Sequence, residues 1–393
     1  MTAPVVIVGG GIAGLALACG LGRANVASTV LEAASDPQPI GAGLQLGPNA
    51  MRALDTLGFA SDDIPGLVAP ETLQIRDRQG RTLLRKPLGE TFAQRYGAPY
   101  RVSHRGDLWS ALRARAEAMD AVTLIDGARI AEIIPAGPRI ALEDGRIYAP
   151  TVLIGADGIR SQVAEALPGP VPLTDHGLEA WRTLVPVPSS EAADNSVTLT
   201  FAPKGGHAVR YPVSAGAAMN LVVITQGSGT DGHNWSMPGE TRDLLARFGG
   251  NPPADLAPWF EMAPGWQRWP LRDRTPTKHW GNRANAPAGP ATVIGDAAHP
   301  ALPFLAQGGA MALEDAAALV TPLVEALSAK GDVSGALRQF EAARKLRTDR
   351  LVRASRGVGR TYHLPFPLSL ARDASLRVAG AALTDRYDWL YRA

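Results

Sequence analysis

The chain has 393 residues, of which 46% are hydrophobic and 19% are charged, a composition typical of a globular enzyme built from about two domains. Its formal net charge of +2 gives no reason to expect binding to nucleic acid or to an anionic membrane. The single cysteine, Cys19, excludes an intramolecular disulfide and a thiolate metal cluster, and we expect no metal site. The N-terminus lacks a basic segment followed by a cleavable apolar stretch, so we expect the protein in the cytoplasm.

The first predicted elements form a dinucleotide-binding turn. Apolar residues 5–8 predict a buried strand, and Gly9, Gly11 and Gly14 follow in G-x-G-x-x-G spacing before an Ala- and Leu-rich helix. These glycines permit, in order, a tight turn, the approach of a pyrophosphate, and close packing of helix on strand. Glu32 lies about 20 residues later, where an acidic side chain is expected to bind a ribose. The alternative is an uncharged transmembrane helix in this region, and the run of glycines argues against it.

A second glycine-rich segment covers residues 41–49 and leads into a helix predicted over residues 48–57. Its glycines would let the backbone approach a ligand, and a plain connecting loop is the alternative. Residues 73–85 alternate in character around a Gln-Gly pair and predict a hairpin. Residues 101–119 are predicted to continue into a helix, which places Arg105 near its start.

The middle of the chain begins with short strands. Residues 122–150 predict a β-meander inserted between the halves of the nucleotide-binding domain. Residues 152–156 then predict another buried strand, followed by a turn at Asp157-Gly158. A helix is predicted over residues 159–167.

A second, smaller domain is predicted from the next strands. Residues 196–201, 207–213 and 219–225 predict a small antiparallel sheet, because turn residues separate these runs. Residues 232–290 are rich in Pro, Gly and Trp, and we interpret this span as loops that join the domains.

The last third of the chain returns to the nucleotide-binding domain. A buried strand ends at Asp296, and a glycine-rich turn then starts a long helix that is predicted to end near residue 329. Glu314 and Asp315, in the first turns of this helix, are interpreted as helix-end electrostatics. A second long helix is predicted over residues 334–360, and its many arginines are interpreted as a solvated face.

These motifs, in this order, resemble those of the single-component (class A) FAD-dependent aromatic hydroxylases, the family of p-hydroxybenzoate, salicylate and 3-hydroxybenzoate hydroxylases. The resemblance covers essentially the whole chain and includes the closing residues 387–391. Its motifs are the N-terminal glycine turn with Glu32, GADGIRS at 155–161, GDAAHP at 295–300 and LAQGGAMALED at 305–315.

The resemblance implies an α/β fold with a Rossmann-like FAD-binding domain, as in p-hydroxybenzoate hydroxylase, an antiparallel β-sheet substrate domain and long C-terminal helices. The FAD-binding domain would comprise residues 1–72, 98–175 and 272–393, and the substrate domain residues 73–97 and 176–271. The chain has no second G-x-G-x-x-G, so NADH or NADPH would bind transiently without a Rossmann domain of its own. A monomer or a homodimer is expected.

The resemblance also assigns residues to FAD. Asp296 would hydrogen-bond the ribityl chain, with a turn-capping role as the alternative, while Asp157 would lie at the pyrophosphate. Amides of Gly308 and Gly309, at a helix N-terminus, would face the flavin N1/C2 carbonyl edge, where reduced flavin is anionic. The expected FAD-binding residues are Gly9, Gly11, Ile12, Ala13, Gly14, Glu32, Ala33, Gly43, Leu44, Arg105, Asp157, Gly158, Asp296, Pro300, Gly308, Gly309 and Ala310.

The activity implied by the resemblance is hydroxylation of a small phenolic or heteroaromatic acid, such as salicylate, by NAD(P)H and O2 through a flavin C4a-hydroperoxide. A base near the substrate hydroxyl would help, because the ring is activated when that hydroxyl loses its proton. His207 and Tyr211 are the candidate catalytic residues, because residues four apart on a strand share a face. Their spacing resembles that in 3-hydroxybenzoate and 6-hydroxynicotinate hydroxylases. An ordinary His and Tyr on a sheet face are the alternative.

The remaining pocket residues that the resemblance indicates are Gln45, Pro303 and Phe304. Pro303 and Phe304 stand where some relatives carry polar residues, which indicates a more apolar wall and argues against 3-hydroxybenzoate or 6-hydroxynicotinate as the literal substrate. Arg182 or Arg210 is a candidate for holding a substrate carboxylate. Arg210 is the weaker choice, because its side chain alternates to the opposite face of the strand.

Two further functions stay open at this point. The same flavin chemistry would serve an epoxidase or a urate-type hydroxylase that acts on another ring. The motifs would also suit a flavin-binding NAD(P)H oxidase or sensor without oxygenase activity. NAD(P)H consumption that is matched by hydroxylated product separates an oxygenase from an oxidase or a sensor.

Overall fold

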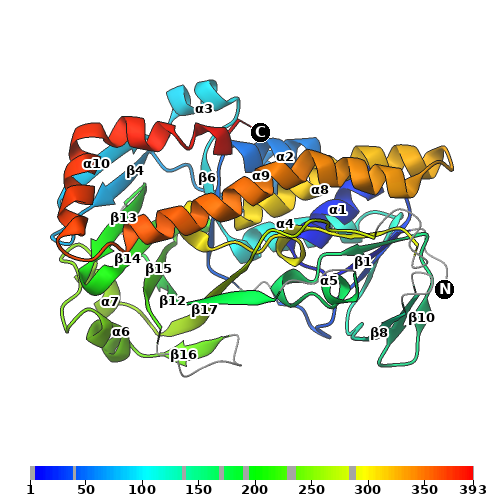
Figure 1. Ribbon diagram of the computed structural model, residues 1–393, viewed down its shortest axis with the longest axis horizontal. Coiled ribbons are helices and arrows are strands. Elements are labelled where there is room, and N and C mark those ends of the chain that lie inside the picture. The colour runs from blue at the N-terminus through cyan, green and yellow to red at the C-terminus, as the bar shows by residue number, and fades with distance from the viewer. Residues whose placement is uncertain are drawn as a thin grey trace.

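The computed structural model describes residues 5–392 except 39–40, 135–138, 168–171, 189–193, 228–235 and 283–288. Two sheets dominate the fold, and the long helix α9 (Val333–Tyr362) runs from the side of one sheet to the other (Figure 1). No helix within the described part of the chain has the length and apolar character needed to cross a membrane.

The smaller of these two sheets is parallel and has five strands in the order β18-β11-β1-β2-β7. Four consecutive residues in β1 are almost fully buried, because helices cover both faces of the sheet, as expected for a doubly wound fold. Its strands are β1 (Val5–Val8), β2 (Ser28–Leu31), β7 (Val122–Ile125), β11 (Val152–Gly155) and β18 (Ala291–Val293).

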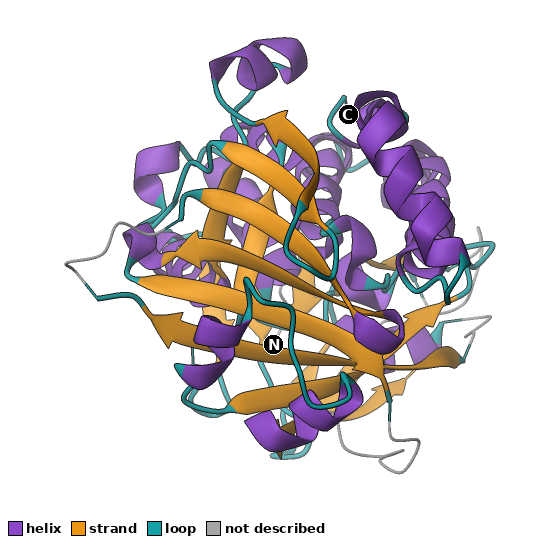
Figure 2. Cartoon of the chain, turned by 90° about the vertical axis from the view of Figure 1, so that its left-hand side faces the viewer, coloured by secondary structure: helices purple, strands orange, loops and turns teal. Residues whose placement is uncertain are grey.

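The larger sheet has eight strands in the order β16-β17-β12-β15-β14-β13-β4-β5, and its strands face the viewer in Figure 2. All neighbours are antiparallel except β4 and β13, which pair in parallel. Its strands are β4 (Thr72–Arg76), β5 (Thr82–Pro87), β12 (Leu173–Pro186), β13 (Ser196–Ala202), β14 (Gly206–Val213), β15 (Ala218–Gln226), β16 (Met237–Gly239) and β17 (Trp266–Arg274).

The two sheets correspond to the predicted α/β architecture, in which a Rossmann-like part is combined with a largely antiparallel sheet. The division into two domains stays our proposal, and the large sheet supports it because its strands lie in residues 72–87 and 173–274. Three of these limits fall within three residues of the proposed boundaries, while the strand that ends at residue 87 stops ten residues before the proposed boundary at 97.

Two small antiparallel sheets complete the β-structure, and both refine the predictions. Strand β3 (Gly43–Leu46) pairs with β6 (Arg101–His104), so the glycine-rich segment 41–49 is not simply a loop. In the predicted meander 122–150, β7 joins the parallel sheet instead. The remaining three strands are β8 (Ile130–Ile134), β9 (Arg139–Leu142) and β10 (Ile147–Tyr148).

The helices that matter most for the site are α1 (Ile12–Arg23), α4 (Arg105–Glu117), α8 (Gly308–Ser328) and α9. Helix α1 packs against both α4 and α8, and α9 packs against α8. The C-terminal helix α10 (Leu368–Asp385), which the sequence analysis did not predict, packs against β5. The other described α-helices are α2 (Pro48–Thr56), α3 (Glu90–Tyr96), α5 (Gln162–Ala166), α6 (Thr241–Arg247) and α7 (Ala257–Glu261).

The interpretation of residues 232–290 as joining loops is wrong for about half of the described part of that span. It contains β16, α6, α7 and the nine-residue strand β17, whose tryptophan and leucine side chains pack in the sheet. Proline and glycine in this span terminate short elements, and their abundance concealed the strand between them. Residues 232–235 and 283–288 of the span lie outside the described residues.

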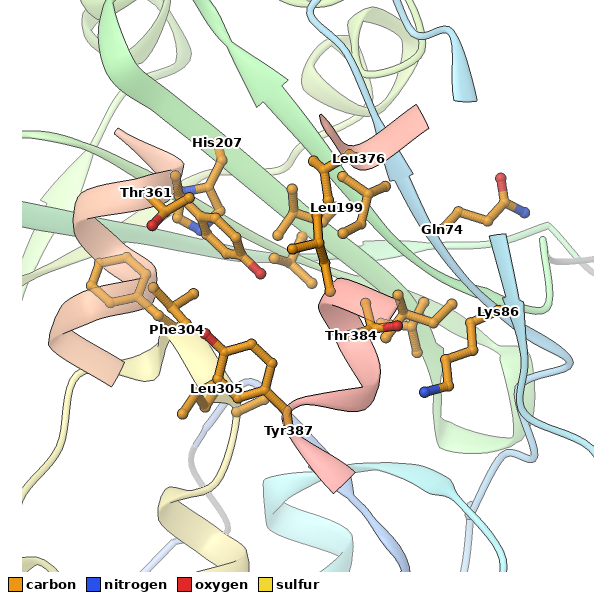
Figure 3. Close-up of a pocket in the computed structure, with 18 of the residues that line it drawn as sticks. Gln74, Lys86, Leu199, His207, Phe304, Leu305, Thr361, Leu376, Thr384 and Tyr387 are labelled. Atoms are coloured by element: carbon orange, nitrogen blue, oxygen red, sulfur yellow. The ribbon is translucent and has the colours of Figure 1, made fainter. Parts of the chain in front are cut away.

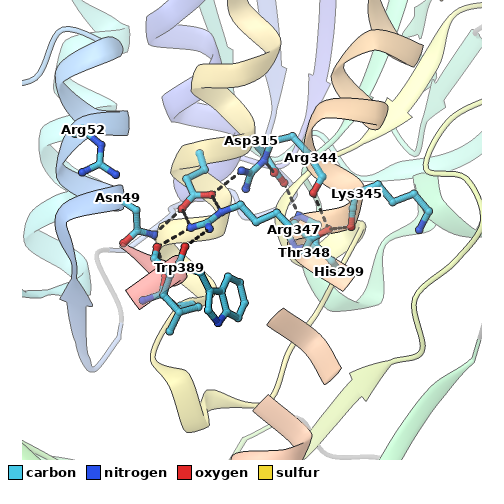
Figure 4. A network of polar contacts seen from close by, with 12 residues as sticks. Asn49, Arg52, His299, Asp315, Arg344, Lys345, Arg347, Thr348 and Trp389 are labelled. Atoms are coloured by element: carbon cyan, nitrogen blue, oxygen red, sulfur yellow. Dashed lines mark hydrogen bonds and ion pairs between the residues drawn. The ribbon is translucent and has the colours of Figure 1, made fainter. Parts of the chain in front are cut away.

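A buried ion-pair network joins α8 to α9 (Figure 4). The fully buried Asp315 accepts hydrogen bonds from Arg344 Nε at 2.8 Å, His299 Nε2 at 2.5 Å and the amide of Gly295 at 2.9 Å. Burial by itself would raise the pKa of Asp315, but His299 and Arg344 outweigh it and lower that pKa to about 2. Asp315 therefore stays ionised and holds three segments together.

The neighbouring residue, Glu314, extends the network toward α2 and the C-terminus. It pairs with Arg344 at 2.6 Å and with Arg347 at 2.8 Å, and it accepts a hydrogen bond from Asn49. Arg347 also donates to the carbonyl groups of Trp389 and Leu390. The interpretation of Glu314 and Asp315 as helix-end electrostatics is therefore wrong, because both are members of this ion-pair network.

The same contacts correct the interpretation of the arginines of α9 as a solvated face. Arg344 is only 6% exposed, and Arg347 is largely buried against Glu314. Other arginines, such as Arg338 and Arg353, do face solvent. Helical periodicity alone could not show which arginines point inward, because their acidic partners lie on another helix.

Replacing Arg344 with methionine is expected to lower the free energy of unfolding by about 3 kcal/mol, since it leaves two buried carboxylates without one of their cations. Arg338→Met is the matched control on the same helix. The ion pair of Arg338 with Asp332 is exposed, so its loss should change that free energy by less than about 1 kcal/mol. Urea unfolding of both variants measures the difference, and equal losses would contradict the network's importance.

Candidate active site

A cavity of about 350 Å³ lies between the two sheets, beyond the carboxyl ends of β1, β11 and β18. Ligands bind in this position in open α/β sheets. On the side of the parallel sheet it is lined by Gly11, Ile12, Ala13, Ala156, Gly158, Asp296, Gly308 and Gly309. On the side of the large sheet it is lined by Arg182, His207, Val209, Tyr211, Val222 and Ile224. We call it the glycine-lined cavity.

The three glycines of the first turn have distinct roles. A Cβ on Gly9 would lie 2.4 Å from the carbonyl oxygen of Ala156, and a Cβ on Gly14 would lie 2.0 Å from that of Gly9. Neither contact is possible, so both positions require glycine for packing. A Cβ on Gly11, by contrast, would meet nothing within 4 Å, so the backbone there is open to a ligand.

Two helices begin at this cavity, with their N-termini facing it. Helix α1 begins at Ile12 and α8 begins at Gly308, and neither has an acidic side chain in its first turn. The first amides of a helix lack intrahelical acceptors and carry partial positive charge. The open space in front of Gly11 and of Gly308 gives a phosphate or another anionic group access to these amides.

Three charged side chains converge inside the cavity. The Asp296 carboxylate is exposed to the cavity but surrounded by protein, and this burial raises its pKa despite nearby Arg105 and Arg182. Burial lowers the pKa of both arginines. Arg182 lies over the Trp269 ring, and its Nε has no hydrogen-bond partner. A polar ligand would complete these contacts.

Ten of the residues predicted to bind FAD line the cavity. They are Gly11, Ile12, Ala13, Gly43, Leu44, Arg105, Gly158, Asp296, Gly308 and Gly309. Two predicted acidic residues instead hydrogen-bond nearby protein groups. Glu32, at the end of β2, accepts hydrogen bonds from the backbone amides of Gly10 at 2.8 Å and Ala34 at 2.9 Å. The lining excludes Gly9, Gly14, Glu32, Ala33, Asp157, Pro300 and Ala310.

Asp157 accepts a hydrogen bond from Ser161 at 2.5 Å and one from the amide of Val163 at 3.2 Å. Its carboxylate thereby fixes the turn before α5, and burial raises its pKa despite these bonds. The backbone of Asp157 packs against Gly9, so the residue shapes the glycine turn from behind.

Strand β14 presents alternate side chains to the cavity. His207, Val209 and Tyr211 line it, in agreement with the two-residue period of a strand. Arg210 points to the other face, where it pairs with Asp194 at 2.7 Å and lies over the Trp259 ring. Of the two arginines that the sequence analysis considered for a substrate carboxylate, Arg182 is therefore the one that lines the cavity.

A second cavity, of about 390 Å³, adjoins the first. We call it the apolar cavity, because leucine, isoleucine, valine and phenylalanine side chains dominate its wall. Figure 3 shows His207, Thr361 and Phe304 on one side of it and Gln74, Lys86 and Thr384 on the other. The residues common to both cavities are Gln45, His207, Val209, Pro303 and Ala306.

The pocket residues predicted from the sequence meet at this junction. Gln45 accepts a hydrogen bond from the Tyr100 hydroxyl at 2.6 Å, which orients its side chain. Pro303 lies at the junction, and Phe304 lines the apolar cavity beside His207, with ring centroids 5.7 Å apart. The two cavities thus share part of their walls, and His207 lines both of them.

His207 has an unpredicted partner at the end of α9. Its Nδ1 lies 3.0 Å from Nε2 of His363. The His207 ring packs against Tyr362, and the His363 ring packs against Phe304. Burial lowers the pKa of His207 well below its usual value, and His363 and Arg372 add to this effect. Burial and Arg372 also lower the pKa of His363, to about 4. At neutral pH the pair is uncharged, so one ring donates and the other accepts.

Sequence reasoning missed His363 and the contribution of α10. His363 lies 156 residues from His207, and a lone histidine at a helix end carries no signal of such a contact. The leucines of α10 that line the apolar cavity follow a helical spacing after Pro365 and Pro367, and that pattern is the one signal that would have found the helix.

Comparison with known proteins identifies the family. The chain matches the FAD binding domain family over residues 2–76 and 143–355. It is 33% identical to a 3-hydroxybenzoate 6-hydroxylase of Klebsiella oxytoca, over 91% of this chain and 88% of that one. It is 34% identical to a 3-amino-4-hydroxybenzoate 2-monooxygenase of Streptomyces platensis, over 98% of this chain and 95% of that one. The chain belongs to the FAD-dependent aromatic hydroxylases.

The hydroxylase fold is also found in a solved structure, that of Klebsiella pneumoniae HpxO complexed with FAD and uric acid. The TM-score is 0.81 at 23% identity, and the match covers 96% of this hydroxylase and 92% of that chain. The glycine-lined cavity of the hydroxylase fits FAD on its own evidence: open backbone at Gly11 and Gly308, and the Asp296 carboxylate exposed to the cavity. The predicted FAD-binding fold is thereby confirmed.

Replacing Asp296 with alanine is expected to weaken FAD binding by about ten- to a hundredfold, because a hydrogen bond to a charged group that lines the cavity is lost. FAD fluorescence titration of the apoprotein measures the dissociation constant. Asp120→Ala, at an exposed turn outside the cavity, is the control and should bind FAD like the unaltered enzyme. Unchanged FAD affinity in the Asp296 variant would remove the ribityl role.

Proposed function

We propose that this enzyme uses NADH or NADPH and O2 to hydroxylate a small phenolic or heteroaromatic acid of the salicylate and hydroxybenzoate type. Two relatives that match nearly the whole chain act on 3-hydroxybenzoate and on 3-amino-4-hydroxybenzoate. The single observation that carries the proposal for this chain is the junction of the two cavities at His207. A ring in the apolar cavity would there meet a cofactor in the glycine-lined cavity.

Bound FAD would supply electron transfer from the nicotinamide donor and the activation of O2. The residues that would hold it are those at the two helix N-termini, together with Asp296 and Arg105. The protein's own contribution is to position the aromatic ring, to exclude water and to move the proton of the substrate hydroxyl.

His207 is the proposed base for that proton. It is 2% exposed and lines both cavities, and its lowered pKa keeps it neutral and able to accept a proton at pH 7. In this scheme Nε2 of His207 accepts the substrate proton, and Nδ1 passes its own proton to Nε2 of His363. His363 is partly exposed, so it would release a proton to solvent.

Arg182 is the proposed partner of a substrate carboxylate. Its guanidinium lines the glycine-lined cavity near Tyr211, and its buried Nε lacks a hydrogen-bond partner. Tyr211 is buried beside it and packs against Gly43, and burial raises its pKa. The tyrosine therefore stays protonated and can donate a hydrogen bond to substrate.

Product stoichiometry tests the proposal. The holoenzyme is mixed with NADH or NADPH and a panel of hydroxybenzoates and hydroxypyridines, and consumed donor is compared with hydroxylated product. One hydroxylated product per donor consumed, with at least one ring, supports the proposal. Donor consumption that yields only peroxide with every ring would instead favour an oxidase or a sensor. Turnover of a purine would favour a urate-type hydroxylase, and an epoxide product would favour an epoxidase.

Replacing His207 with alanine is expected to slow hydroxylation by about a hundredfold or more, while flavin reduction by NAD(P)H changes little. Anaerobic stopped-flow measures the reduction step, and quenched-flow product analysis measures hydroxylation. His279→Ala, at an exposed histidine outside both cavities, is the control. Equal losses in both steps would contradict a role as base.

The acid limb of the pH profile gives a separate test. The pKa of His207 lies below the ordinary value of about 6.5, so the base stays unprotonated as the pH falls through 6.5. We expect kcat/KM for hydroxylation to hold at pH 6 and to decline only at lower pH, where His207 gains its proton. If kcat/KM falls to half of its maximum on the acid side at pH 7 or above, this assignment is contradicted.

Residence in the cytoplasm, a monomeric or homodimeric state and the choice between NADH and NADPH remain predictions from the sequence. The electron-donor choice is read directly from the same turnover experiment. Gel filtration of the holoenzyme gives the oligomeric state.

A further inference from the structure

We propose that the preferred substrate is a hydroxylated aromatic ring that carries an extended apolar substituent, which lies in the apolar cavity. This inference rests on the proposed function, because it places the reacting ring at the junction beside His207. It goes beyond that function by assigning the remainder of the apolar cavity to a second part of the substrate.

The size of the cavity is the first argument. The apolar cavity measures about 390 Å³, whereas an apolar cavity of about 150 Å³ is enough to bind benzene. A bare hydroxybenzoate at the junction would leave more than half of the space unfilled. Protein interiors are close-packed, so an apolar space of this size beside a binding site indicates a ligand that fills it.

The chemistry of the wall is the second argument. From the large sheet, the apolar side chains of the wall are Leu73, Ile75, Val197, Leu199, Phe201 and Val209, and the polar ones are Gln74, Lys86 and His207. From α10, Leu376 and Leu383 line the cavity together with Arg372, Ser375 and Thr384. Leu376 packs against the cluster formed by Ile75, Leu199 and Phe201. These surfaces suit a hydrocarbon chain, not a second charged group.

The cationic side chains of the wall are already engaged by the protein. Lys86 Nζ lies 3.0 Å from Asp385, and the Arg372 guanidinium lies 2.7 Å from Asp373 and over the Phe201 ring. Arg386 donates to the Tyr387 hydroxyl at 3.0 Å. A substrate carboxylate would therefore find its partner at Arg182, in the other cavity. This polarity orients the substrate, with the acid and hydroxyl at the junction and the apolar substituent directed away.

The direction of the substituent follows from the arrangement in Figure 3. His207, which also lines the glycine-lined cavity, lies at one end with Phe304 and Thr361, while Lys86, Gln74 and Thr384 lie at the other end. Leu199 and Leu376 lie between these ends. A chain attached to a ring beside His207 would pass along these two leucines toward the far end of the cavity.

The test uses FAD-loaded enzyme and two series of salicylates with unbranched alkyl groups, from methyl to heptyl, at ring position 4 or 5. Titration is followed by the change in the visible absorption of bound FAD, and hydroxylated product is measured in parallel. Each added methylene that enters the cavity is expected to lower Kd by about three- to fourfold until the cavity is filled. The gain should appear in at least one series.

Leu376→Trp is expected to abolish the gain from the longer alkyl groups, because the indole fills the middle of the cavity. Retention of FAD and an unchanged circular dichroism spectrum show that the variant is folded. Leu370→Trp is the matched control: Leu370 lies on the same helix, is 54% exposed and does not line the cavity. This control should keep the full gain.

The outcomes separate the two proposals. If unsubstituted salicylate is bound and hydroxylated while Kd does not fall along either alkyl series, the extended substituent is ruled out and the proposed function stands. A gain that survives in Leu376→Trp would also overturn the placement in the apolar cavity. If every ring in both series gives only peroxide, the proposed hydroxylase function itself fails.

Discussion

The buried carboxylate of Asp315 is the contact on which the geometry of the active site depends. It binds the amide of Gly295, the His299 ring and the Arg344 guanidinium at once, and it is fully buried. A buried charge is tolerated only when such partners replace its hydration. Gly295 and His299 flank Asp296, so the network fixes the position of the one carboxylate that, among the described residues, lines the glycine-lined cavity.

Because α8 carries Asp315, the same network also fixes the helix whose N-terminus meets that cavity. Glu314, beside it, binds Asn49 of α2 and Arg347 of α9, and Arg347 holds the C-terminal carbonyls. Segments from both ends of the chain are thus anchored around one helix. The result is a rigid frame for the cofactor, against which the large sheet presents His207, Tyr211 and Arg182.

Features that depend on neighbouring residues could be predicted from the sequence. The glycine spacing, the strand that precedes it and the two-residue alternation of β14 are local, and each has a steric reason that leaves few alternatives. The overall α/β architecture and the long helices after Asp296 follow from the same kind of pattern. Family resemblance then added the cofactor, which no pattern of spacing identifies by itself.

Features that depend on pairs distant in sequence could not be predicted. The contact of His207 with His363, and that of Arg344 with Asp315, join residues on different elements, and neither sequence segment indicates its partner. The abundant Pro and Gly around β17 obscured a strand, because the neighbouring strand β12 supplies the pairing that stabilises it. Strands β4 and β5, strands β13 and β14, and helix α10 all contribute to the wall of the apolar cavity. Its volume and polarity therefore depend on how distant segments pack, which no single segment of the sequence indicates.

The central claim is that the reacting face of the cofactor meets the substrate ring at the junction formed by Gln45, His207, Val209, Pro303 and Ala306. A crystal structure of the enzyme with FAD and a bound salicylate tests it most directly. The account predicts that the flavin ring closes the glycine-lined cavity at this junction and that the substrate hydroxyl lies within hydrogen-bonding distance of His207 Nε2. A flavin ring that lies away from the junction, or a substrate that does not contact His207, would contradict it.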